Sequence, residues 1–395
     1  MDREAFANVD LSGIETPCFI VDEGCVEHNL QILAGVQKRA GCRILLALKA
    51  FAMWNVFPLI SQYLRGVCAG SVLEARLGAE EFGGEVHVYA PAYSEHDFRE
   101  ILRYATHIVF NSVGQWEKYQ LWFAEVIRPI SCGLRVNPRE PVAKEVFEHY
   151  DPGLPGSGLG CTVESIAGRK LQGISGLHFH ALCEQNVEPL RKVLAAFEAK
   201  FDEQIRQVKW VNFGGGHHIT RDDYDVDGLC ELILDFKRRY PNIKTVYLEP
   251  GEAVVLNAGV MVTSVLDIVS EDDLKIAVLD MSAEAHNPDV IITRHQAQPY
   301  VPEILGAGGA GEYPHEYKLR GISCAAGDVL GTYSFAEPLA VGQILMMLNM
   351  VLYTMVKVNT FCGAALPSLM ARNSAGEIRL VKKFDCYEEF KRRLS

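Results

Sequence analysis

Short apolar strands alternate with helix-length segments along the first two thirds of the chain, from about residue 15 to residue 265. The segments 25–40 (CVEHNLQILAGVQKRA) and 187–201 (VEPLRKVLAAFEAKF) are two of the expected helices. Such alternation predicts parallel strands joined by crossover helices. The expected strands are RILLAL (43–48), EVHVYA (85–90), HIVFN (107–111), SCGLRVN (131–137), GLHFHAL (176–182), WVNFGGG (210–216) and TVYLEP (245–250).

Seven or eight strand–helix units are enough to close a parallel sheet on itself. A (β/α)8 barrel typically takes about 250 residues, which is the length of the alternating region. We therefore predict an α/β fold in which residues 27–264 form a (β/α)8 barrel. An open, doubly wound sheet is the alternative that the same alternation allows.

The helical rhythm fades after about residue 265, and the remaining segments have the pattern of strands interrupted by glycine and proline. Residues 1–26 and 265–395 are therefore predicted to form a second, mainly β domain. A chain of 395 residues is long enough for a barrel and such a domain. The expected strands here are LKIAVLD (274–280), DVIIT (289–293), DVLGTYSF (328–335) and EIRLVKKF (377–384).

Composition narrows the partners and the compartment. A formal net charge of -12 argues against nucleic acid or an anionic membrane as a partner. The 11 cysteines show neither CxxC nor Cys/His zinc spacing, so we expect reduced thiols in the cytoplasm and no metal. Residues 1–13 lack the apolar core of a signal peptide, and the stretch 344–358 is too short and mixed to span a membrane.

A single lysine, Lys49, interrupts the apolar run LLALKAFA (45–52). Lysine is almost never fully buried without a partner, and burial lowers the pKa of its ammonium group. In one interpretation, Lys49 lies at a strand end and reaches water. In the other, its desolvated amine is a nucleophile that forms a Schiff base with an aldehyde such as pyridoxal phosphate.

Several further candidates occupy positions equivalent to that of Lys49. Catalytic residues of (β/α) barrels lie at the C-terminal ends of the strands, and Lys49 ends the strand 43–48. His178 and His180 alternate along one strand and share a face, so an imidazole there could stack on a cofactor ring; a satisfied core histidine is the simpler interpretation. The other candidates at strand ends are Gly214, Gly215, Gly216 and Glu249.

The segment NFGGGHHI (212–219) places three consecutive glycines after a strand. Their backbone N–H groups could wrap a phosphate, although a tight turn is the simpler interpretation. Glu249, in LEPGE, could face a pyridine nitrogen and keep it protonated, unless it is only an acid at a strand end. His217 and His218 have no carboxylate at a metal-binding spacing, so we assign them a structural role.

The loop ISCAAGD (322–328) of the second domain contains Cys324 and Asp328. A thiol can donate a proton, and a carboxylate can bind a substrate ammonium. An inert, buried cysteine is the commoner state of this residue type. The loop therefore gives a functional hypothesis only in combination with the barrel residues.

Lysine–aldehyde chemistry, a phosphate loop and a ring-nitrogen acid occur together in barrel order, and the combination indicates pyridoxal 5'-phosphate. The segments concerned resemble those of the fold-type III pyridoxal-phosphate decarboxylases, the group of alanine racemase and ornithine decarboxylase. They are most similar to the carboxynorspermidine/carboxyspermidine decarboxylase family. The resemblance is carried by LALKAFAMWNVFPLI (46–60), GLHFHALCEQ (176–185), WVNFGGGHHITRDDYDV (210–226), LEPGEAVVLNAG (248–259), LDMSAEAHNPDV (279–290), CAAGDVLGTYSF (324–335) and YTMVKVNTF (353–361).

The resemblance implies a role for each matching residue. Lys49 would bond to the cofactor aldehyde, His180 would stack on its ring, and Glu249 would meet the pyridine nitrogen. The phosphate would be held by Gly214, Gly215, Gly216 and Tyr353. Cys324 would return a proton after carbon dioxide leaves, and Asp328 would bind the distal amine of the substrate. The cysteine loop comes from the partner subunit in this group, which implies a homodimer with shared active sites.

Three positions depart from the resembled pattern. Glu252 stands where related amino-acid decarboxylases have the arginine that supports the phosphate. An acid would repel a phosphate, so we expect Glu252 to turn elsewhere, toward the substrate. Ala325 replaces the aspartate of ornithine decarboxylases, which argues against ornithine, and Cys362 replaces the usual asparagine.

The predicted reaction is decarboxylation of carboxynorspermidine or carboxyspermidine to the polyamine, with Glu184, His286 and Asp289 as further polar contacts to the substrate. These two substrates differ by one methylene, which is worth only about 1–3 kcal/mol of discrimination. One alternative is a decarboxylase of diaminopimelate, ornithine or arginine, or a racemase, on the same fold. The other is a non-catalytic pyridoxal-phosphate carrier or regulatory subunit.

Overall fold

The computed structural model describes residues 5–142, 150–169, 171–296 and 299–395. Two compact units make up the chain: Glu27–Val254, here the barrel unit, and Met1–Val26 with Val255–Ser395, here the sheet unit. The boundary predicted at residue 264 falls inside strand β10 (Gly259–Glu271). That strand pairs with β1 and β15, so the whole of it belongs to the sheet unit.

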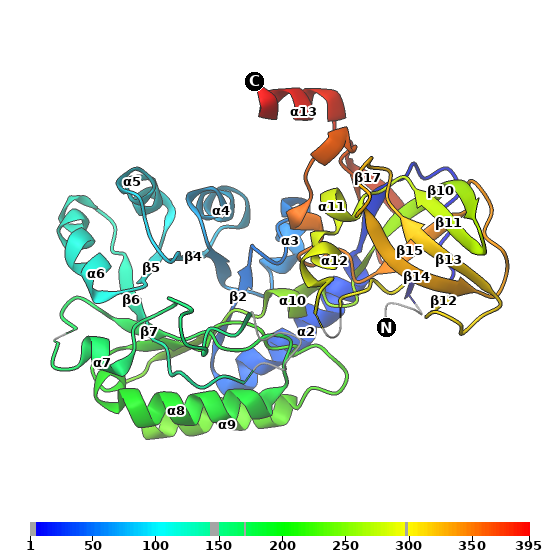
Figure 1. The fold of residues 1–395 in the computed structure, drawn as a ribbon. Coiled ribbons are helices and arrows are strands. Elements are labelled where there is room, and N and C mark those ends of the chain that lie inside the picture. The colour runs from blue at the N-terminus through cyan, green and yellow to red at the C-terminus, as the bar shows by residue number, and fades with distance from the viewer. Residues whose placement is uncertain (1–4, 143–149, 170, 297–298) are drawn as a thin grey trace. The chain divides into compact units, whose positions relative to one another are not determined.

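Eight parallel strands close the barrel in chain order, and β2 pairs with β9 to complete it (Figure 1). The prediction of a closed barrel is therefore confirmed, and the open sheet is excluded. The barrel strands are β2 (Arg43–Ala47), β3 (Gly66–Ala69), β4 (Glu85–Tyr89), β5 (His107–Phe110), β6 (Ser131–Arg135), β7 (Gly176–His178), β8 (Trp210–Asn212) and β9 (Thr245–Leu248).

Strand β3 is the one barrel strand that the sequence pattern missed. Its four residues, GVCA, are too few and too small to show a strand pattern. Its first residue, Gly66, has no room for a side chain, because a Cβ there would lie 2.0 Å from the carbonyl oxygen of Glu85. The close approach of β4 therefore accounts for a glycine in this strand.

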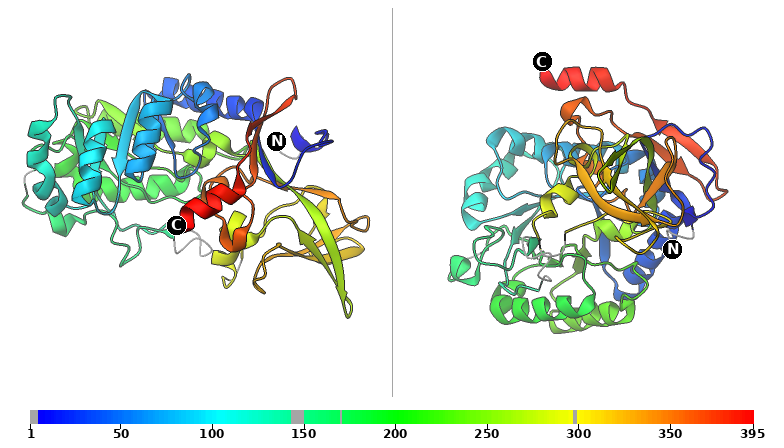
Figure 2. Two further views of the ribbon diagram at one scale, coloured as in Figure 1. Left: turned by 90° about the horizontal axis from the view of Figure 1, so that it is seen from above. Right: turned by 45° about the vertical axis from the view of Figure 1, so that its right-hand side comes forward.

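Helices follow the strands on the outside of the barrel, and α8 and α9 lie side by side there (Figures 1 and 2). Ser71, Ser94 and Ser112 begin three of the helices, where each hydroxyl accepts the N–H of the residue three positions on. Such caps are worth about 1 kcal/mol each. The helices are α2 (Glu23–Ala40), α3 (Phe57–Ile60), α4 (Val72–Leu77), α5 (Glu95–Tyr104), α6 (Val113–Tyr119), α7 (Val163–Ile166), α8 (Val187–Ile205), α9 (Val226–Arg239) and α10 (Gly251–Val255).

The indole of Trp210, the first residue of β8, packs inside the barrel near the end where the strands begin. It packs with Leu45, Val109 and Tyr247. A Cβ on Gly176 would lie 2.0 Å from this indole, and one on Gly133 would lie 2.4 Å from it. The two glycines on the neighbouring strands β7 and β6 therefore make space for one large side chain, as close packing requires.

The sheet unit contains strands in the order β12-β14-β13-β11-β10-β1-β16-β17, with β15 also paired to β10. β1 runs antiparallel to β10 and parallel to β16, so the N-terminal segment is built into this unit. Its strands besides β10 are β1 (Cys18–Asp22), β11 (Leu274–Leu279), β12 (Ala307–Gly308), β13 (His315–Arg320), β14 (Val329–Phe335), β15 (Ile344–Leu348), β16 (Ser368–Arg372) and β17 (Ile378–Lys382). Its helices are α11 (Ala283–His286), α12 (Pro288–Thr293) and α13 (Cys386–Leu394).

The strand predicted for DVIIT (289–293) is wrong, because these residues form helix α12. Pro288 stands at the first position of the helix, where its missing N–H costs nothing and its fixed φ favours helical geometry. The β-branched residues Val290, Ile291 and Ile292 suggested a strand, and this start signal overrides them.

Among the described residues, no helix combines the length and the apolar character needed to cross a membrane.

Candidate active site

A cavity opens at the C-terminal end of the barrel, and strands from around its circumference contribute side chains to it. This is the end at which barrel enzymes carry their catalytic residues. The cavity gathers Lys49, His180 and Glu249, three of the residues that the sequence singled out for cofactor chemistry. Its lining comprises Ala47, Lys49, Cys68, Ala69, Gly70, Glu74, His87, Val88, Tyr89, Val109, Arg135, His178, His180 and Glu249.

Lys49 follows β2 in a tight turn, and its side chain is exposed into this cavity. The turn is fixed by backbone bonds from the N–H groups of Ala50 and Phe51 to the carbonyl of Ala47, while the N–H of Leu48 donates to Cys68 on β3. The strand thus stays buried up to Ala47, and the amine emerges beyond it. This placement explains how one charged group can stand within an apolar run.

His180 lies two residues beyond β7, with its Nδ1 atom held by the backbone N–H of Gly215 at 2.9 Å. Burial and the neighbouring charges of Lys49 and Arg135 hold the pKa of His180 well below its usual range. The imidazole is therefore neutral at physiological pH, with Nδ1 as the acceptor. A neutral, fixed ring is suited to stacking against an aromatic ligand, which is the role that the resemblance implies.

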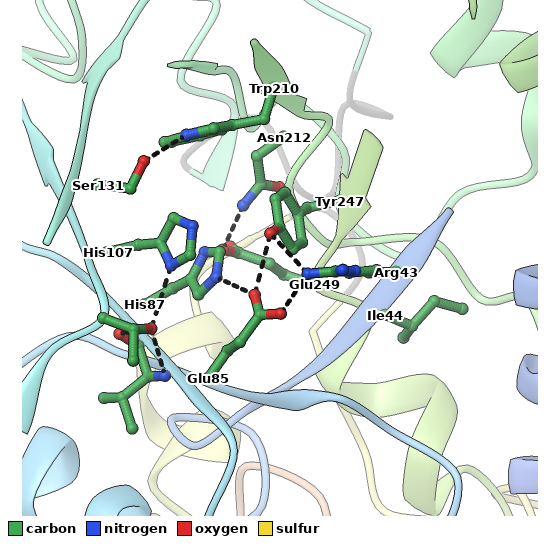
Figure 3. Close-up of polar contacts among 12 residues, drawn as sticks. Arg43, Ile44, Glu85, His87, His107, Ser131, Trp210, Asn212, Tyr247 and Glu249 are labelled. Atoms are coloured by element: carbon green, nitrogen blue, oxygen red, sulfur yellow. Dashed lines mark hydrogen bonds and ion pairs between the residues drawn. The ribbon is translucent and has the colours of Figure 1, made fainter. Parts of the chain in front are cut away.

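Glu249 lies directly after β9, and its carboxylate has a neighbour on each side. The Asn212 amide donates to its Oε1 atom at 2.7 Å (Figure 3), and Nε2 of His178 lies 3.7 Å from its Oε2 atom. Burial lowers the pKa of His178 to about 4, although the charge of Glu249 opposes this effect. At neutral pH His178 is therefore an uncharged neighbour of the carboxylate.

The glycine loop passes close to the backbone on both sides. Gly214 and Gly216 have φ values of +73° and +81°, and a Cβ on any of the three glycines would meet a carbonyl within 2.6 Å. The N–H of Gly214 donates to Asn212 and that of Gly215 to His180. These two glycines therefore supply the shape of a cradle, and phosphate binding through the N–H of Gly216 stays a prediction.

Glu252 does turn away from the phosphate loop, but toward another side chain of the barrel. Its Oε2 atom lies 3.2 Å from Nε2 of His218, and both side chains are buried. Neither residue lines the cavity around Lys49. The expected contact of Glu252 with substrate thus has no support in this geometry. Glu184, beyond β7, has a left-handed backbone with a φ of 53°, and its role in substrate binding stays a prediction.

Below the cavity, a polar layer closes the barrel at the start of its strands (Figure 3). Glu85 on β4 accepts hydrogen bonds from Arg43 and Tyr247 and lies 3.1 Å from His87. Burial alone would raise the pKa of Glu85, but these neighbours lower it to about 2. Three side chains here, those of Glu85, His87 and His107, are close enough to share a metal ion.

The geometry of this layer argues against a metal. The rings of His87 and His107 are stacked, with centroids 3.8 Å apart and planes 18° from parallel. Nitrogen lone pairs lie in the ring planes, so stacked imidazoles cannot aim at one ion. The Arg43 guanidinium also already neutralises the Glu85 carboxylate. We interpret the layer as an ion-pair network that seals the barrel floor.

The sheet unit carries the remaining predicted site residues. Cys324 is exposed, with its Sγ atom 3.9 Å from that of Cys362. Asp328 is fully buried, and its two carboxylate oxygens accept the N–H groups of Ala283 and Ser323, at 2.7 Å and 3.0 Å. This arrangement gives Asp328 a structural function, because it ties its loop to the start of α11, so its predicted contact with a substrate amine is not supported here.

Three further predicted residues lie in the same unit. His286 is fully buried and accepts the N–H of Ser282, while Asp289 forms an ion pair with Lys357 at 2.6 Å. Tyr353 adopts a left-handed backbone with a φ of 49°. Their roles toward cofactor or substrate stay predictions. Each of Asp289 and His286 already has a protein partner that accounts for its position.

Sequence reasoning missed three polar residues inside the barrel, of which Tyr89 and Arg135 line the cavity and Asn212 is fully buried. Tyr89, Arg135 and Asn212 stand at inward positions on β4, β6 and β8, and Arg135 lies 4.6 Å over the ring of Tyr89. The period-2 alternation of a strand could have placed all three inside the barrel. Polar residues within short apolar strands were the available signal, because a barrel interior is usually filled by branched apolar side chains.

Comparison with known proteins identifies the family of this chain. The family described as "Pyridoxal-dependent decarboxylase, C-terminal sheet domain" matches residues 18–351. The chain belongs to this family of pyridoxal-dependent decarboxylases, enzymes that use pyridoxal 5'-phosphate.

The curated relatives are more specific. A carboxyaminopropylagmatine decarboxylase from Synechocystis is 39% identical over 388 residues, covering 98% of this chain and 97% of that protein. A carboxynorspermidine/carboxyspermidine decarboxylase from Campylobacter jejuni is also 39% identical over 388 residues, covering 95% and 98%. The crystal structure of carboxynorspermidine decarboxylase from C. jejuni, complexed with norspermidine, has a TM-score of 0.87 and 38% identity, covering 96% of this chain and 100% of that one.

The residues of the cavity fit the cofactor. The amine of Lys49 and the carboxylate of Glu249 line the same cavity, as an aldehyde and a pyridine nitrogen on one ring require. The glycine loop leaves no space for side chains, so backbone can approach a phosphate there. Both ring nitrogens of His178 are buried in the described structure without a hydrogen-bond partner, and this residue also lines the cavity.

Proposed function

We propose that this decarboxylase acts on a carboxylated polyamine, carboxynorspermidine or carboxyspermidine, and releases the corresponding polyamine. The observation that carries the proposal is the 39% identity, over 388 residues, to the C. jejuni decarboxylase of that name. The cavity supports it, because Lys49, His180 and Glu249 converge there from three different strand ends.

Pyridoxal 5'-phosphate supplies an electron sink for the bond that breaks when carbon dioxide leaves. Lys49 would hold the aldehyde of the cofactor through Nζ. The neutral ring of His180 would pack on the face of the cofactor, and Glu249 would keep a proton at the pyridine nitrogen. Asn212 holds the Glu249 carboxylate through a hydrogen bond. Gly216 and Tyr353 would contact the phosphate.

Cys324 is the proposed proton donor in the second half of the reaction. Its thiol is exposed, as a group that approaches a substrate must be. Cys324 would donate the proton on Sγ to the carbon that has lost carbon dioxide. Glu184, His286, Asp289 and Asp328 are the remaining proposed contacts to the substrate, with Asp328 the weakest because its oxygens are already occupied.

Carboxyaminopropylagmatine is the second candidate substrate. The Synechocystis decarboxylase named for it has the same 39% identity and covers slightly more of this chain. The two candidates differ in the part of the molecule that does not react, so the same catalytic residues serve both. Only the contacts to that distal part can separate them.

The test is carbon dioxide release by the purified enzyme with a panel of substrates. The panel contains carboxynorspermidine, carboxyspermidine, carboxyaminopropylagmatine, meso-diaminopimelate, ornithine and arginine. We expect the highest kcat/KM with a carboxylated triamine. A higher value with carboxyaminopropylagmatine would transfer the assignment to that substrate. Release from an amino acid alone would contradict the polyamine assignment, and no release from any of them would favour a regulatory protein.

We further propose a cytoplasmic homodimer whose active sites combine Lys49 of one subunit with Cys324 of the other. Equal mixtures of the inactive variants Lys49→Ala and Cys324→Ala then form hybrids with one intact site. After subunit exchange we expect about a quarter of the wild-type activity. Recovery of no activity, with a dimer confirmed by ultracentrifugation, would show that each subunit builds its own site.

A further inference from the structure

We propose that Asn212 is a positioning residue that couples the acid at the cofactor ring to the glycine loop at the phosphate. The inference rests on the proposed placement of the cofactor, with its ring nitrogen at Glu249 and its phosphate at the loop. Asn212 was not among the residues that the sequence singled out.

The amide of Asn212 bridges these two parts directly. Its Nδ2 atom donates to Oε1 of Glu249 at 2.7 Å, and its Oδ1 atom accepts the N–H of Gly214 at 2.8 Å. The backbone completes a closed ring, because the N–H of Glu249 donates to the carbonyl of Gly214 at 2.8 Å. Three hydrogen bonds thus join three residues, each bonded to the other two.

An amide is the chemical group that this position requires. It offers a donor and an acceptor on one rigid plane, whereas a carboxylate only accepts and an aliphatic side chain does neither. Asn212 is fully buried, so either bond, once broken, leaves a polar group without water to replace it. Figure 3 shows the amide aimed at Glu249 from the neighbouring strand.

The surroundings leave Asn212 as the principal direct restraint on the Glu249 side chain. Among the other neighbours, Nε2 of His178 lies 3.7 Å away, beyond hydrogen-bond distance, and the Cys68 thiol, a weak donor, also contacts the carboxylate. The loop has a second anchor at Gly215, whose N–H is held by His180. Asn212 therefore sets where the acid stands relative to the loop, and His180 sets where the loop stands relative to the ring face.

An exchange of partners tests this coupling. Asn212→Asp retains the acceptor for Gly214 but loses the donor, and it sets two carboxylates against each other. The double variant Asn212→Asp with Glu249→Gln reverses the direction of the bond, since the amide at position 249 then donates to the carboxylate at position 212. Glu249→Gln alone preserves the original bond, because the amide oxygen still accepts from Asn212. Cofactor dissociation from each holoenzyme, and cofactor titration of each apoprotein, measure the coupling without turnover.

We expect Asn212→Asp to bind the cofactor about 10- to 100-fold more weakly than the wild type, as the loss of a buried bond to a charged group implies. The double variant should recover this affinity up to the level of Glu249→Gln alone, which has already lost the contact of the acid with the ring nitrogen. It should nevertheless stay as slow in turnover as Glu249→Gln, because neither protein has an acid at the ring nitrogen. Wild-type affinity in Asn212→Asp, or no recovery in the double variant, would overturn the proposal.

Asn242→Asp is the matched control. Asn242 is another amide of the barrel unit. Its side chain donates to the carbonyls of Ile205 and Val208, which do not belong to the glycine loop. We expect this variant to lose thermal stability while it retains cofactor affinity; an equal loss of affinity would show that destabilisation alone explains the effect. If Asn212→Asp does not fold, Asn212→Leu in the Glu249→Gln background tests the same bond without charge repulsion.

The test of the coupling through Asn212 and the test of the substrate have independent outcomes. Cofactor affinities that follow the exchange would support the role of Asn212 even if no carboxylated polyamine is turned over. Turnover of such a substrate together with unchanged affinity in Asn212→Asp would retain the function and remove Asn212 from the site.

Discussion

The sulfur atoms of Cys324 and Cys362 lie 3.9 Å apart, on the loop after β13 and on the turn Phe361–Gly363. Both thiols are exposed. The pair offers a comparison that a single cysteine would not, because two thiols in nearly the same environment have different proposed roles. Cys324 is the proposed proton donor, and Cys362 has no proposed part in the reaction.

We predict that Cys324→Ala slows turnover by about 10²- to 10⁴-fold, the range typical of a lost general acid, while the cofactor remains bound. Cys362→Ala serves as the matched control and should retain most of its activity. The measurements are kcat and the visible absorbance of the bound cofactor. Equal losses in both variants would assign the effect to the contact between the two loops and remove Cys324 from the reaction.

Stability should fall as the solution becomes acidic, because several histidines are buried in the neutral form. Burial lowers the pKa of His107 to about 3 and the pKa values of His178, His217 and His286 to about 4. Since these folded-state pKa values lie below the unfolded value of 6.5, the unfolded chain binds more protons between pH 6.5 and pH 4. The stabilisation is fully present above pH 6.5 and is lost as the pH falls through this window.

For His178 this pKa shift corresponds to a loss of about 3 kcal/mol in the free energy of unfolding when the pH falls from above 6.5 to below 4. Urea unfolding at pH 7.5, 6 and 5 measures the effect. We expect His107→Gln to flatten the dependence on pH and the exposed His96→Gln to leave it unchanged. A midpoint that does not move between pH 7.5 and pH 5 would contradict the account.

Gly215→Ala should abolish cofactor binding or folding, because its Cβ would lie 2.2 Å from the carbonyl oxygen of Glu249. No flexible side chain can move to relieve this contact. Gly35→Ala is the control: it lies within α2, has no atom within 4 Å of the added carbon, and should stabilise the protein by up to about 1 kcal/mol. Thermal unfolding and cofactor titration separate the two. Normal cofactor affinity in Gly215→Ala would show that the loop adapts.

The barrel was predictable because its signals are local. Alternation of strands and helices marked seven of the eight strands, and the position of Lys49 at a strand end followed from the same pattern. Strand β3 carried no such signal, because it has only four small residues and its Gly66 leaves the space that β4 occupies. The strand predicted for 289–293 was wrong because Pro288 at the first helical position favours a helix, whereas the β-branched residues suggested a strand.

The partners of each site residue were less predictable, because contacts distant in sequence decide them. Glu249 meets Asn212 across 37 positions, and Glu252 meets His218 across 34. Nothing in LEPGE distinguishes the carboxylate that faces the cavity from the one that pairs with a histidine. Asp328 had the expected residue type in the expected loop, yet the backbone N–H groups of Ala283 and Ser323 occupy its carboxylate oxygens.

The covalent link between Lys49 and the cofactor is the measurement that tests the account most directly. Borohydride reduction of the holoenzyme fixes the cofactor to the lysine that holds its aldehyde, and peptide mass spectrometry then locates it. We predict that the label is found on the peptide that contains Lys49, and that Lys49→Ala carries none. A label on another lysine, or the same labelling in both proteins, would contradict the assignment of this cavity as the active site.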